Sequence, residues 1–176
     1  MSNDPSGRIT LKNMILEAQQ ATISTYKANF SSKALPIDYM ISGTALSASS
    51  ASPTFSYPKT ENWQKAIGAH IFWISADIHA EKTRTGKISF ETVMTTNIED
   101  MYNFNPSQKD IATGIPDSEN GRLATSGLAR QYLNYSQISK AFSWEGLSAG
   151  TKVTVKNQPT RRTRQSSDNR RIRNRL

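Results

Sequence analysis

The segment KISFETVMTTNI (residues 87–98) alternates apolar and polar side chains, and this feature constrains the fold most strongly. One parity of the segment holds the large apolar residues Ile88, Phe90, Met94 and Ile98. Because successive side chains of a strand point to opposite faces, the pattern predicts a half-buried strand. The preceding segment AHIFWISADIHA (69–80) is rich in Ile and aromatic residues, and EKTRTG (81–86) supplies turn residues. Residues 69–98 therefore predict an antiparallel hairpin.

The segments on either side of this hairpin predict helices and further strands, which together indicate an α+β fold class. Residues 11–30 carry apolar side chains at three- and four-residue steps, which predicts a helix with Thr10 as its N-cap. A short helix is expected from Thr60 to Ile67, with Gly68 just past its end. One more helix and two more strands are expected at 123–133, 136–144 and 151–156, with Val153 and Val155 of the last segment facing inward. The sequence thus predicts N-terminal helices followed by an antiparallel sheet with a long acidic active-site loop.

The chain divides into three regions of different composition. They are a helical N-terminal region (1–60), an α+β domain (61–156) and a basic tail (157–176) that is expected to be disordered in isolation. Within the first region, the Ser/Ala/Pro-rich stretch 42–58 predicts a surface loop or hinge. No run approaches the ~20 apolar residues that a membrane-spanning helix requires.

The positive charge of the chain lies at its C-terminal end. Residues 1–151 hold 13 basic and 13 acidic side chains, so the whole net charge of +8 belongs to residues 152–176. Seven arginines of the tail could bind a polyanion: Arg161, Arg162, Arg164, Arg170, Arg171, Arg173 and Arg175. Such an arm suits an anionic membrane surface, nucleic acid or an acidic protein. The alternative is a solubilising terminus, and the sequence leaves both open.

The long loop 98–122 combines five carboxylates with prolines, glycines and aromatic residues. Asp100, Tyr102 and Asn103 lie where the predicted strand ends, so the strand can position them. A carboxylate can act as a general base or bind a divalent cation, and a phenol can donate a hydrogen bond to an oxyanion. The alternative is structural: these side chains satisfy turn backbone or pack into the core.

The two histidines offer weaker signals. Asp77, His79 and Glu81 project to one face of a strand, which suits either a metal site or an ordinary solvated face. His70 lies beside Ile71 and Phe72 and is expected to be a packed histidine. The absence of cysteine excludes thiol chemistry, and the sequence contains neither a nucleophile elbow nor a phosphate-binding glycine motif.

The motif DMYNFN, followed by GLARQY and ISKAFSW, resembles the active-site segment of the colicin M family of bacteriocins. The extended segment also resembles C-terminal domains of polymorphic, Rhs-type bacterial toxins, and the resemblance covers about residues 70–145. It implies an antibacterial effector, secreted or delivered into a target bacterium, that acts in the periplasm. It further implies Mg²⁺-dependent phosphoester cleavage of lipid II, the lipid-linked peptidoglycan precursor, and a cognate immunity protein as partner.

Carried over by position, the resemblance assigns the family's first Asp and its Tyr to Asp100 and Tyr102. Asp100 is then an acid–base group or a magnesium ligand, and Tyr102 an orienting group. The family's second Asp is Asn103 here, and its His-Arg pair is replaced by Lys109 and Asp110. The catalytic candidates are therefore Asp100, Tyr102, Asn103, Asp110 and Arg122, the last two as substitutes for the altered pair.

Two other functions fit the same residues. One is a nucleic-acid-targeting toxin that uses the arginine tail for phosphates and the acidic loop for a metal ion. The other is a non-enzymatic effector that perturbs membranes. The sequence does not decide whether the chain is an enzyme.

Overall fold

The computed structural model describes residues 3–49, 52, 54–102, 109, 114–128, 130 and 132–156, with Lys65, Ala66, Tyr102, Asp117 and Asn120 described by backbone alone. These residues form three helices and a six-stranded antiparallel sheet, which confirms the α+β class. In chain order the elements are α1 (Pro5–Asn29), β1 (Ile37–Ser42), β2 (Leu46–Ala48), α2 (Glu61–Ala66), β3 (His70–Lys82), β4 (Ile88–Tyr102), α3 (Asp117–Thr125), β5 (Tyr132–Glu145) and β6 (Thr154–Lys156).

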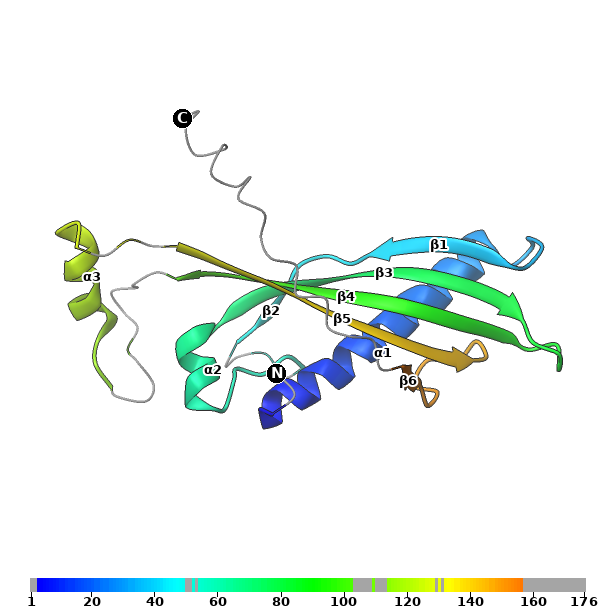
Figure 1. Cartoon of the computed structure of the whole chain (residues 1–176), viewed down its shortest axis with the longest axis horizontal. Coiled ribbons are helices and arrows are strands. Elements are labelled where there is room, and N and C mark those ends of the chain that lie inside the picture. Colours follow the sequence, from blue (N-terminus) through cyan, green and yellow to red (C-terminus); the bar gives the residue numbers. More distant parts are fainter. Residues whose placement is uncertain are drawn as a thin grey trace, which may run out of the picture.

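The long strands β3, β4 and β5 form the centre of the sheet (Figure 1). The strand order is β1-β3-β4-β5-β6, and β2 pairs with β3 beyond the end of β1. The predicted hairpin is therefore confirmed as β3 and β4, although both strands run further than the sequence indicated. β5 begins at Tyr132 rather than at residue 136. All of β5 pairs with β4, from Glu145 opposite Ser89 to Tyr132 opposite Tyr102.

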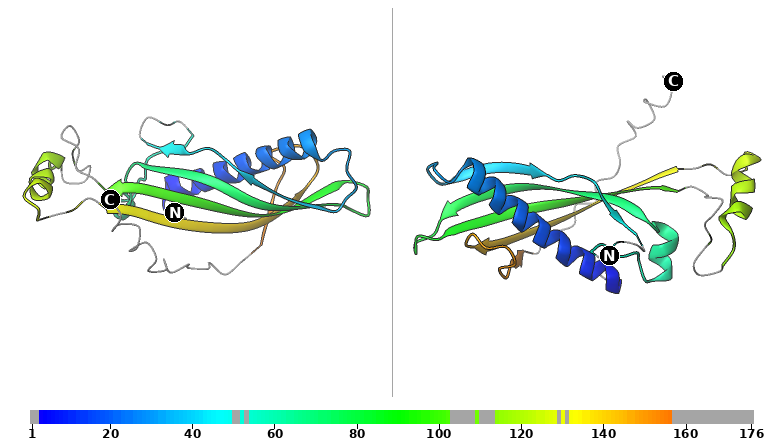
Figure 2. Two further views of the ribbon diagram at one scale, coloured as in Figure 1. Left: turned by 90° about the horizontal axis from the view of Figure 1, so that it is seen from above. Right: turned by 180° about the vertical axis from the view of Figure 1, so that it is seen from behind.

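Helix α1 lies along one face of the sheet and leaves the other face open (Figure 2). The helix buries Met14, Ala18 and Tyr26 against even-numbered residues of β3 and β4, among them Phe72 and Phe90. The ring of Tyr26 meets that of Phe90 edge to face, with centroids 5.6 Å apart. Even-numbered residues of β4 pair with even-numbered residues of both β3 and β5. The core positions of all three long strands therefore lie on this covered face.

The start of α1 differs from the sequence-based expectation. The helix begins at Pro5, with Asp4 as its N-cap, whereas Thr10 is a buried residue inside it. A carboxylate before a proline at the first helical position is a strong start signal, because the oxygen accepts from an N–H that the helix leaves unpaired. The Asp4 carboxylate accepts from the backbone N–H of Gly7 at 2.9 Å, and also from those of Lys59 and Thr60 at 3.0 and 2.6 Å.

The region expected to be helical, residues 1–60, also contributes two strands. β1 and β2 both pair with β3, so residues 1–60 and 61–156 share one sheet and one core. The stretch 42–58 was expected to be a surface loop, but Ala48 and Phe55 within it are buried. The ring of Phe55 packs edge to face on Phe72 at 4.6 Å, because the segment folds back over the end of the sheet.

The turn between β3 and β4 fixes their register. Thr83 and Lys87 exchange hydrogen bonds through backbone and hydroxyl atoms, and Gly86 adopts a positive φ of 82°. Only glycine takes this backbone conformation without strain, so the chain reverses there and Lys82 pairs with Ile88.

The remaining boundaries shift by several residues. The helix expected at 123–133 is wrong over most of its length: α3 spans Asp117–Thr125, with Ser126 as its C-cap before Gly127, and β5 begins at Tyr132. The strand expected at 151–156 is β6 and spans three residues, with Val153 packed on the core and Val155 49% exposed. Within the described ranges, no helix has the length and apolar character needed to cross a membrane.

Candidate functional site

Asp100 lies on the covered face near the end of β4, at the position the sequence indicated. The strand places it opposite Asn134 of β5, whose side chain hydrogen-bonds its carboxylate. Burial raises the pKa of the Asp100 carboxyl, and the hydrogen bond from Asn134 and the nearby His70 oppose that rise only in part. A carboxyl held this way is a candidate proton donor or acceptor.

His70 opens β3 on the same face, next to Asp100. β3 and β4 pair from Ile71 and Glu99 onward, so His70 and Asp100 continue that ladder by one step. The imidazole is 5% exposed, and its Nδ1 lies 3.0 Å from the carbonyl oxygen of Gly68. Burial lowers the pKa of His70, whereas the Gly68 carbonyl and the Asp100 carboxylate raise it.

A cavity of about 350 Å³ reaches Asn134, the hydrogen-bond partner of Asp100, but not His70 or Asp100 themselves. It is lined by Asn62, Trp63, Ile67, Ile98, Asn134, Tyr135 and Ser136. Asn134 belongs both to this lining and to the Asp100 hydrogen bond, so it links the carboxyl to the cavity. We call His70, Asp100, Asn134 and this cavity the Asp100 site.

The structure accounts for only part of the predicted catalytic set. Asn103 and Asp110 lie outside the described residues, as does the side chain of Tyr102, whose backbone ends β4 opposite Tyr132. Arg122 lies on α3, beyond the far ends of β4 and β5 (Figure 1), and pairs there with Glu119 at 3.1 Å. Among the described residues, Asp100 is therefore brought together with His70 and Asn134, and not with Arg122.

A magnesium ion would find too few ligands among the described residues of the Asp100 site. Mg²⁺ takes six oxygen ligands in near-octahedral geometry. Asp100 supplies one carboxylate, while the neighbouring Glu99 belongs to the opposite face by strand alternation. The described part of the chain holds no group of three or more His, Asp or Glu that could bind a metal ion. We therefore derive no chemical step through a metal.

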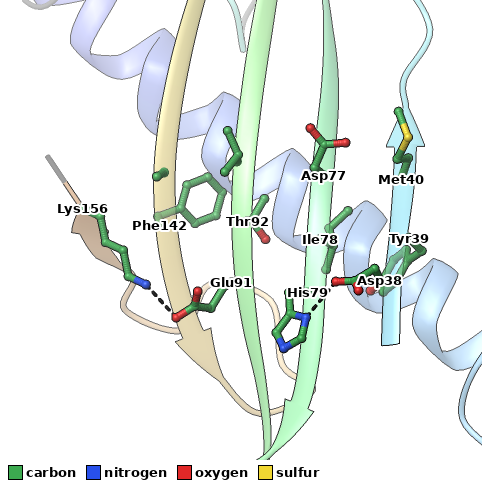
Figure 3. Close-up of a pocket in the computed structure, with 12 residues that line it drawn as sticks. Asp38, Tyr39, Met40, Asp77, Ile78, His79, Glu91, Thr92, Phe142 and Lys156 are labelled. Carbon is green, nitrogen blue, oxygen red and sulfur yellow. Dashed lines mark hydrogen bonds and ion pairs between the residues drawn. The ribbon is translucent and has the colours of Figure 1, made fainter. Parts of the chain in front are cut away.

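The open face of the sheet carries a second polar site, which we call the open-face groove (Figure 3). This groove has a volume of about 660 Å³ and crosses β1, β3, β4, β5 and β6 near the end of the sheet remote from Asp100. Figure 3 shows α1 behind the sheet at this point and the charged side chains in front of it.

Two ion pairs bridge the strands of the groove. The Nδ1 atom of His79 lies 2.7 Å from the Asp38 carboxylate, and the ammonium of Lys156 lies 2.6 Å from that of Glu91. The hydrogen bond and positive charge of Lys156 lower the pKa of Glu91. The side chains of both pairs are between 40% and 83% exposed, so water screens them.

The Asp77 and His79 side chains do share the open face (Figure 3), and Glu81 has the same parity on β3, as strand alternation predicted. His79, however, turns toward Asp38 of the neighbouring strand, and Glu81 is exposed beside the β3–β4 turn. The seven arginines proposed to bind polyanions, from Arg161 to Arg175, lie outside the described residues.

The sequence predicted a packed His70, and its burial confirms that prediction. It did not place His70 beside Asp100, and it gave no role to Asn134 or Trp63. One signal was present: His70 and Asp100 both have the parity of the core residues, so they had to share a face. The signal was insufficient because parity does not reveal which residues of two strands stand opposite each other.

The fold and the site together define an α+β protein in which one helix covers a long antiparallel sheet and a carboxyl–imidazole pair sits at the strand ends. No family model, curated protein or solved structure matches this chain.

Proposed function

We propose that this chain is an antibacterial toxin or effector domain that acts at the bacterial envelope, with phosphoester cleavage in lipid II as its reaction. The motif around Asp100 resembles that of the colicin M family, and the site offers a carboxyl suited to proton transfer. The observation that carries the proposal is Asp100 itself: a half-buried carboxyl near a strand end, with a raised pKa, hydrogen-bonded to Asn134 of the cavity lining.

The cavity of the Asp100 site suits an amphipathic substrate. Trp63, Ile67 and Ile98 give it an apolar wall, and Asn62 and Asn134 add amide groups that can hydrogen-bond phosphate or sugar oxygens. A lipid-linked pyrophosphate combines these two kinds of chemistry at its reactive bond. The fit supports this substrate class over a free sugar or a free phosphate.

In the proposed reaction Asp100 handles the proton. The carboxylate takes a proton from water as the water oxygen forms its bond to phosphorus, and the bond from phosphorus to the leaving oxygen breaks. The proton then passes to that oxygen. The raised pKa of Asp100 brings this carboxyl closer to neutral pH, where it both accepts and donates effectively. Asn134 holds the carboxyl in one orientation.

Magnesium enters the proposal only through the resemblance. The ion would neutralise charge on the pyrophosphate. Asp100 is the described residue that would contribute to holding it. Activity that survives a chelator would remove magnesium from the proposal without affecting the role of Asp100.

The test is hydrolysis of labelled lipid II by the full chain in detergent with magnesium, measured as released undecaprenol or pyrophosphate-linked sugar. Asp100→Asn keeps the size and the Asn134 contact, so its rate should fall on the order of 10²–10⁴-fold. Asp38→Asn, in the open-face groove, is the matched control and should retain full activity. No release by the wild-type chain would overturn the proposed substrate.

The two other functions predict different outcomes. A nucleic-acid-targeting toxin should lose nucleic-acid binding when residues 157–176 are deleted, whereas a lipid II hydrolase should retain activity in detergent. A non-enzymatic effector should remain fully toxic as the Asp100→Asn variant. The partners in the proposal are the lipid-linked substrate, a cognate immunity protein and an anionic membrane surface reached by the basic tail.

A further inference from the structure

The open face of the sheet carries almost only negative charge. Strand register assigns to this face the odd-numbered residues of β3, β4 and β5 and the even-numbered residues of β1 and β6. These strand positions hold one ammonium, Lys156, and six carboxylates: Asp38, Asp77, Glu81, Glu91, Glu99 and Glu145. Soluble surfaces ordinarily intersperse both signs of charge, so this face is short of cations.

The ion pairs of the open-face groove satisfy only two of these carboxylates. Asp38 pairs with His79 and Glu91 with Lys156, and Asp77 lines the same groove but takes part in neither pair (Figure 3). In the part of the chain that the structure describes, four carboxylates of this face have no ion-pair partner: Asp77, Glu81, Glu99 and Glu145.

The one ammonium on the face marks where the basic tail begins. Lys156 is the last residue of β6, and its Nζ lies 2.6 Å from the Glu91 carboxylate. Because β6 runs antiparallel to β5, with Lys156 opposite Ala141, the chain leaves β6 toward the Tyr132 end of β5. The tail therefore starts on the open face, with one ion pair formed, and heads along the sheet.

The groove offers a short route from this starting point to Asp77. One row of paired residues crosses the sheet from Lys156 through Ala141 and Val93 to Asp77, so the floor between the two charged ends consists of small side chains. Neighbouring strands are ~4.8 Å apart, which puts Asp77 about 14 Å from Lys156. An extended chain advances at most ~3.6 Å per residue, so Arg161 can lie up to about 18 Å from Lys156.

The other end of the open face suits arginine in particular. Glu99 stands opposite Tyr135, whose ring lies 6.5 Å from that of Trp73. A guanidinium can pair with a carboxylate and stack on an aromatic ring at the same time, whereas an ammonium is a compact point charge. All seven basic residues of 157–176 are arginines, against one acid, Asp168. Glu99 is eight residues along β4 from Glu91, or about 26 Å, which arginines from Arg170 onward can reach.

We propose that the open face of the sheet binds the chain's own basic tail, residues 157–176. Arg161 and its neighbours occupy the open-face groove at Asp77, and the arginines from Arg170 onward occupy the surface at Glu99 and Tyr135. The inference is independent of the proposed function. It has one consequence for the tail: an external polyanion has to displace the arginines from the sheet before it can bind them.

The first test locates the tail in the full chain. The sequence contains no cysteine, so Ser167→Cys provides a single thiol for a nitroxide label. At low salt the label should broaden the methyl signals of Met40 and Met101, on the open face, several-fold more than those of Met14 and Met94, on the covered face. Salt on the order of 1 M, where the Debye length is about 3 Å, should remove the difference.

Equal broadening of the four methyl signals, or none, would overturn the proposal. A mixture of nitroxide-bearing chain and isotope-labelled chain without nitroxide separates binding within one chain from binding between copies. Signals in the mixture should stay sharp. Broadening of Met40 and Met101 there would assign the tail to a second copy and overturn binding within the chain.

The second test removes the carboxylates from the face. Trypsin cleaves the tail in proportion to the population in which it is free, so Asp77→Asn combined with Glu99→Gln should speed tail cleavage about 3–10-fold at low salt. Glu17→Gln, which neutralises an exposed carboxylate on α1, is the matched control and should leave the rate unchanged. Equal rates for the two proteins would overturn the proposal. The salt dependence of the Met40 and Met101 signals, measured without either substitution in the sheet, covers a double variant that fails to fold.

Discussion

The two histidines of β3 stand on opposite faces of the same strand and differ in almost every property. His70 is buried on the covered face, with Nδ1 on a backbone carbonyl and Nε2 without a partner among the described residues. His79 lies on the open face, 40% exposed, with Nδ1 on the carboxylate of Asp38. Both have an aspartate as neighbour, and burial raises the pKa of the Asp100 carboxyl.

The difference arises from solvent and not from residue type. On the open face, water solvates the side chains of His79 and Asp38 whether or not they pair, so the pair contributes little. On the covered face, charge on either partner is unfavourable, and each depends on the other and on fixed dipoles. A histidine and an aspartate become a candidate catalytic pair only where the fold removes water from both.

The largest effect we expect contrasts core packing on the two faces. Phe72→Ala removes a fully buried ring that packs on Phe55, and it should lower the free energy of unfolding by about 3–5 kcal/mol. Val93→Ala, on the open face and 36% exposed, should cost less than about 1 kcal/mol. Urea unfolding of both variants measures the contrast. Equal costs would show that a partner or another segment covers the open face.

The next effect concerns two carboxylates of unequal burial. Burial favours the neutral form of Asp4, but hydrogen bonds from the backbone of Gly7, Thr60 and Lys59 lower its pKa to about 2. Asp4→Ala leaves these N–H groups unpaired and should cost about 2–3 kcal/mol. Asp38→Ala, which removes an 83% exposed side chain, should cost almost nothing.

The same carboxylate predicts a pH dependence. The folded pKa of Asp4 lies below its unfolded value, so its contribution is present above about pH 4 and is lost as the pH falls toward 2. Acid unfolding of the Asp4→Ala variant should therefore show a smaller loss of stability in that window than the wild type. Parallel curves for the two proteins would contradict the lowered pKa.

A smaller effect tests the backbone that holds His70. Gly68 has a φ of +54°, and an added Cβ would approach Tyr57 and Gln64 at 3.3 and 3.4 Å. Gly68→Ala should cost about 1–2 kcal/mol and shift the nitrogen signals of His70. Gly43→Ala is the control, because its Cβ would meet only the Ile74 carbonyl at an ordinary 3.5 Å. Unchanged His70 signals would argue that the Gly68 carbonyl does not orient the ring.

Asp100 should show the opposite sign of stability change. Its folded pKa is raised, so its contribution is present below the unfolded pKa and is lost as the pH rises through the folded value. Asp100→Asn should therefore raise the melting temperature at pH 7 while it removes activity. A purely structural Asp100 would instead lose stability on substitution.

The smallest effect belongs to the open-face groove. Lys156→Ala breaks the pair with Glu91, and His79→Asn weakens the pair with Asp38. Each variant should lower the free energy of unfolding by less than about 1 kcal/mol, and by less still at high salt. Thermal unfolding at low and high salt measures this. A loss of several kcal/mol from either variant would erase the distinction between the two faces.

Sequence reasoning located the hairpin and the long helix because their buried positions recur with a fixed period. It placed Asp100 at a strand end for the same reason. It missed β1, although the burial of this short strand alternates along Ile37–Ser42. It missed β2 and the buried Phe55, because the stretch 42–58 is rich in Ser and Ala and leaves no periodic signal. It started α1 at Thr10, although Asp4 before Pro5 is a local start signal for the helix.

By itself, the sequence determined the α+β class, the alternation of β4 and the concentration of positive charge in the last 25 residues. These follow from local spacing and composition. Only the tertiary structure decided that His70 stands beside Asp100 and His79 beside Asp38. The physical reason is the strand register. Several alignments of β3 and β4 would bury the same residues, and the Thr83–Lys87 turn selects one of them. That alignment decides which polar side chains lie next to each other away from water.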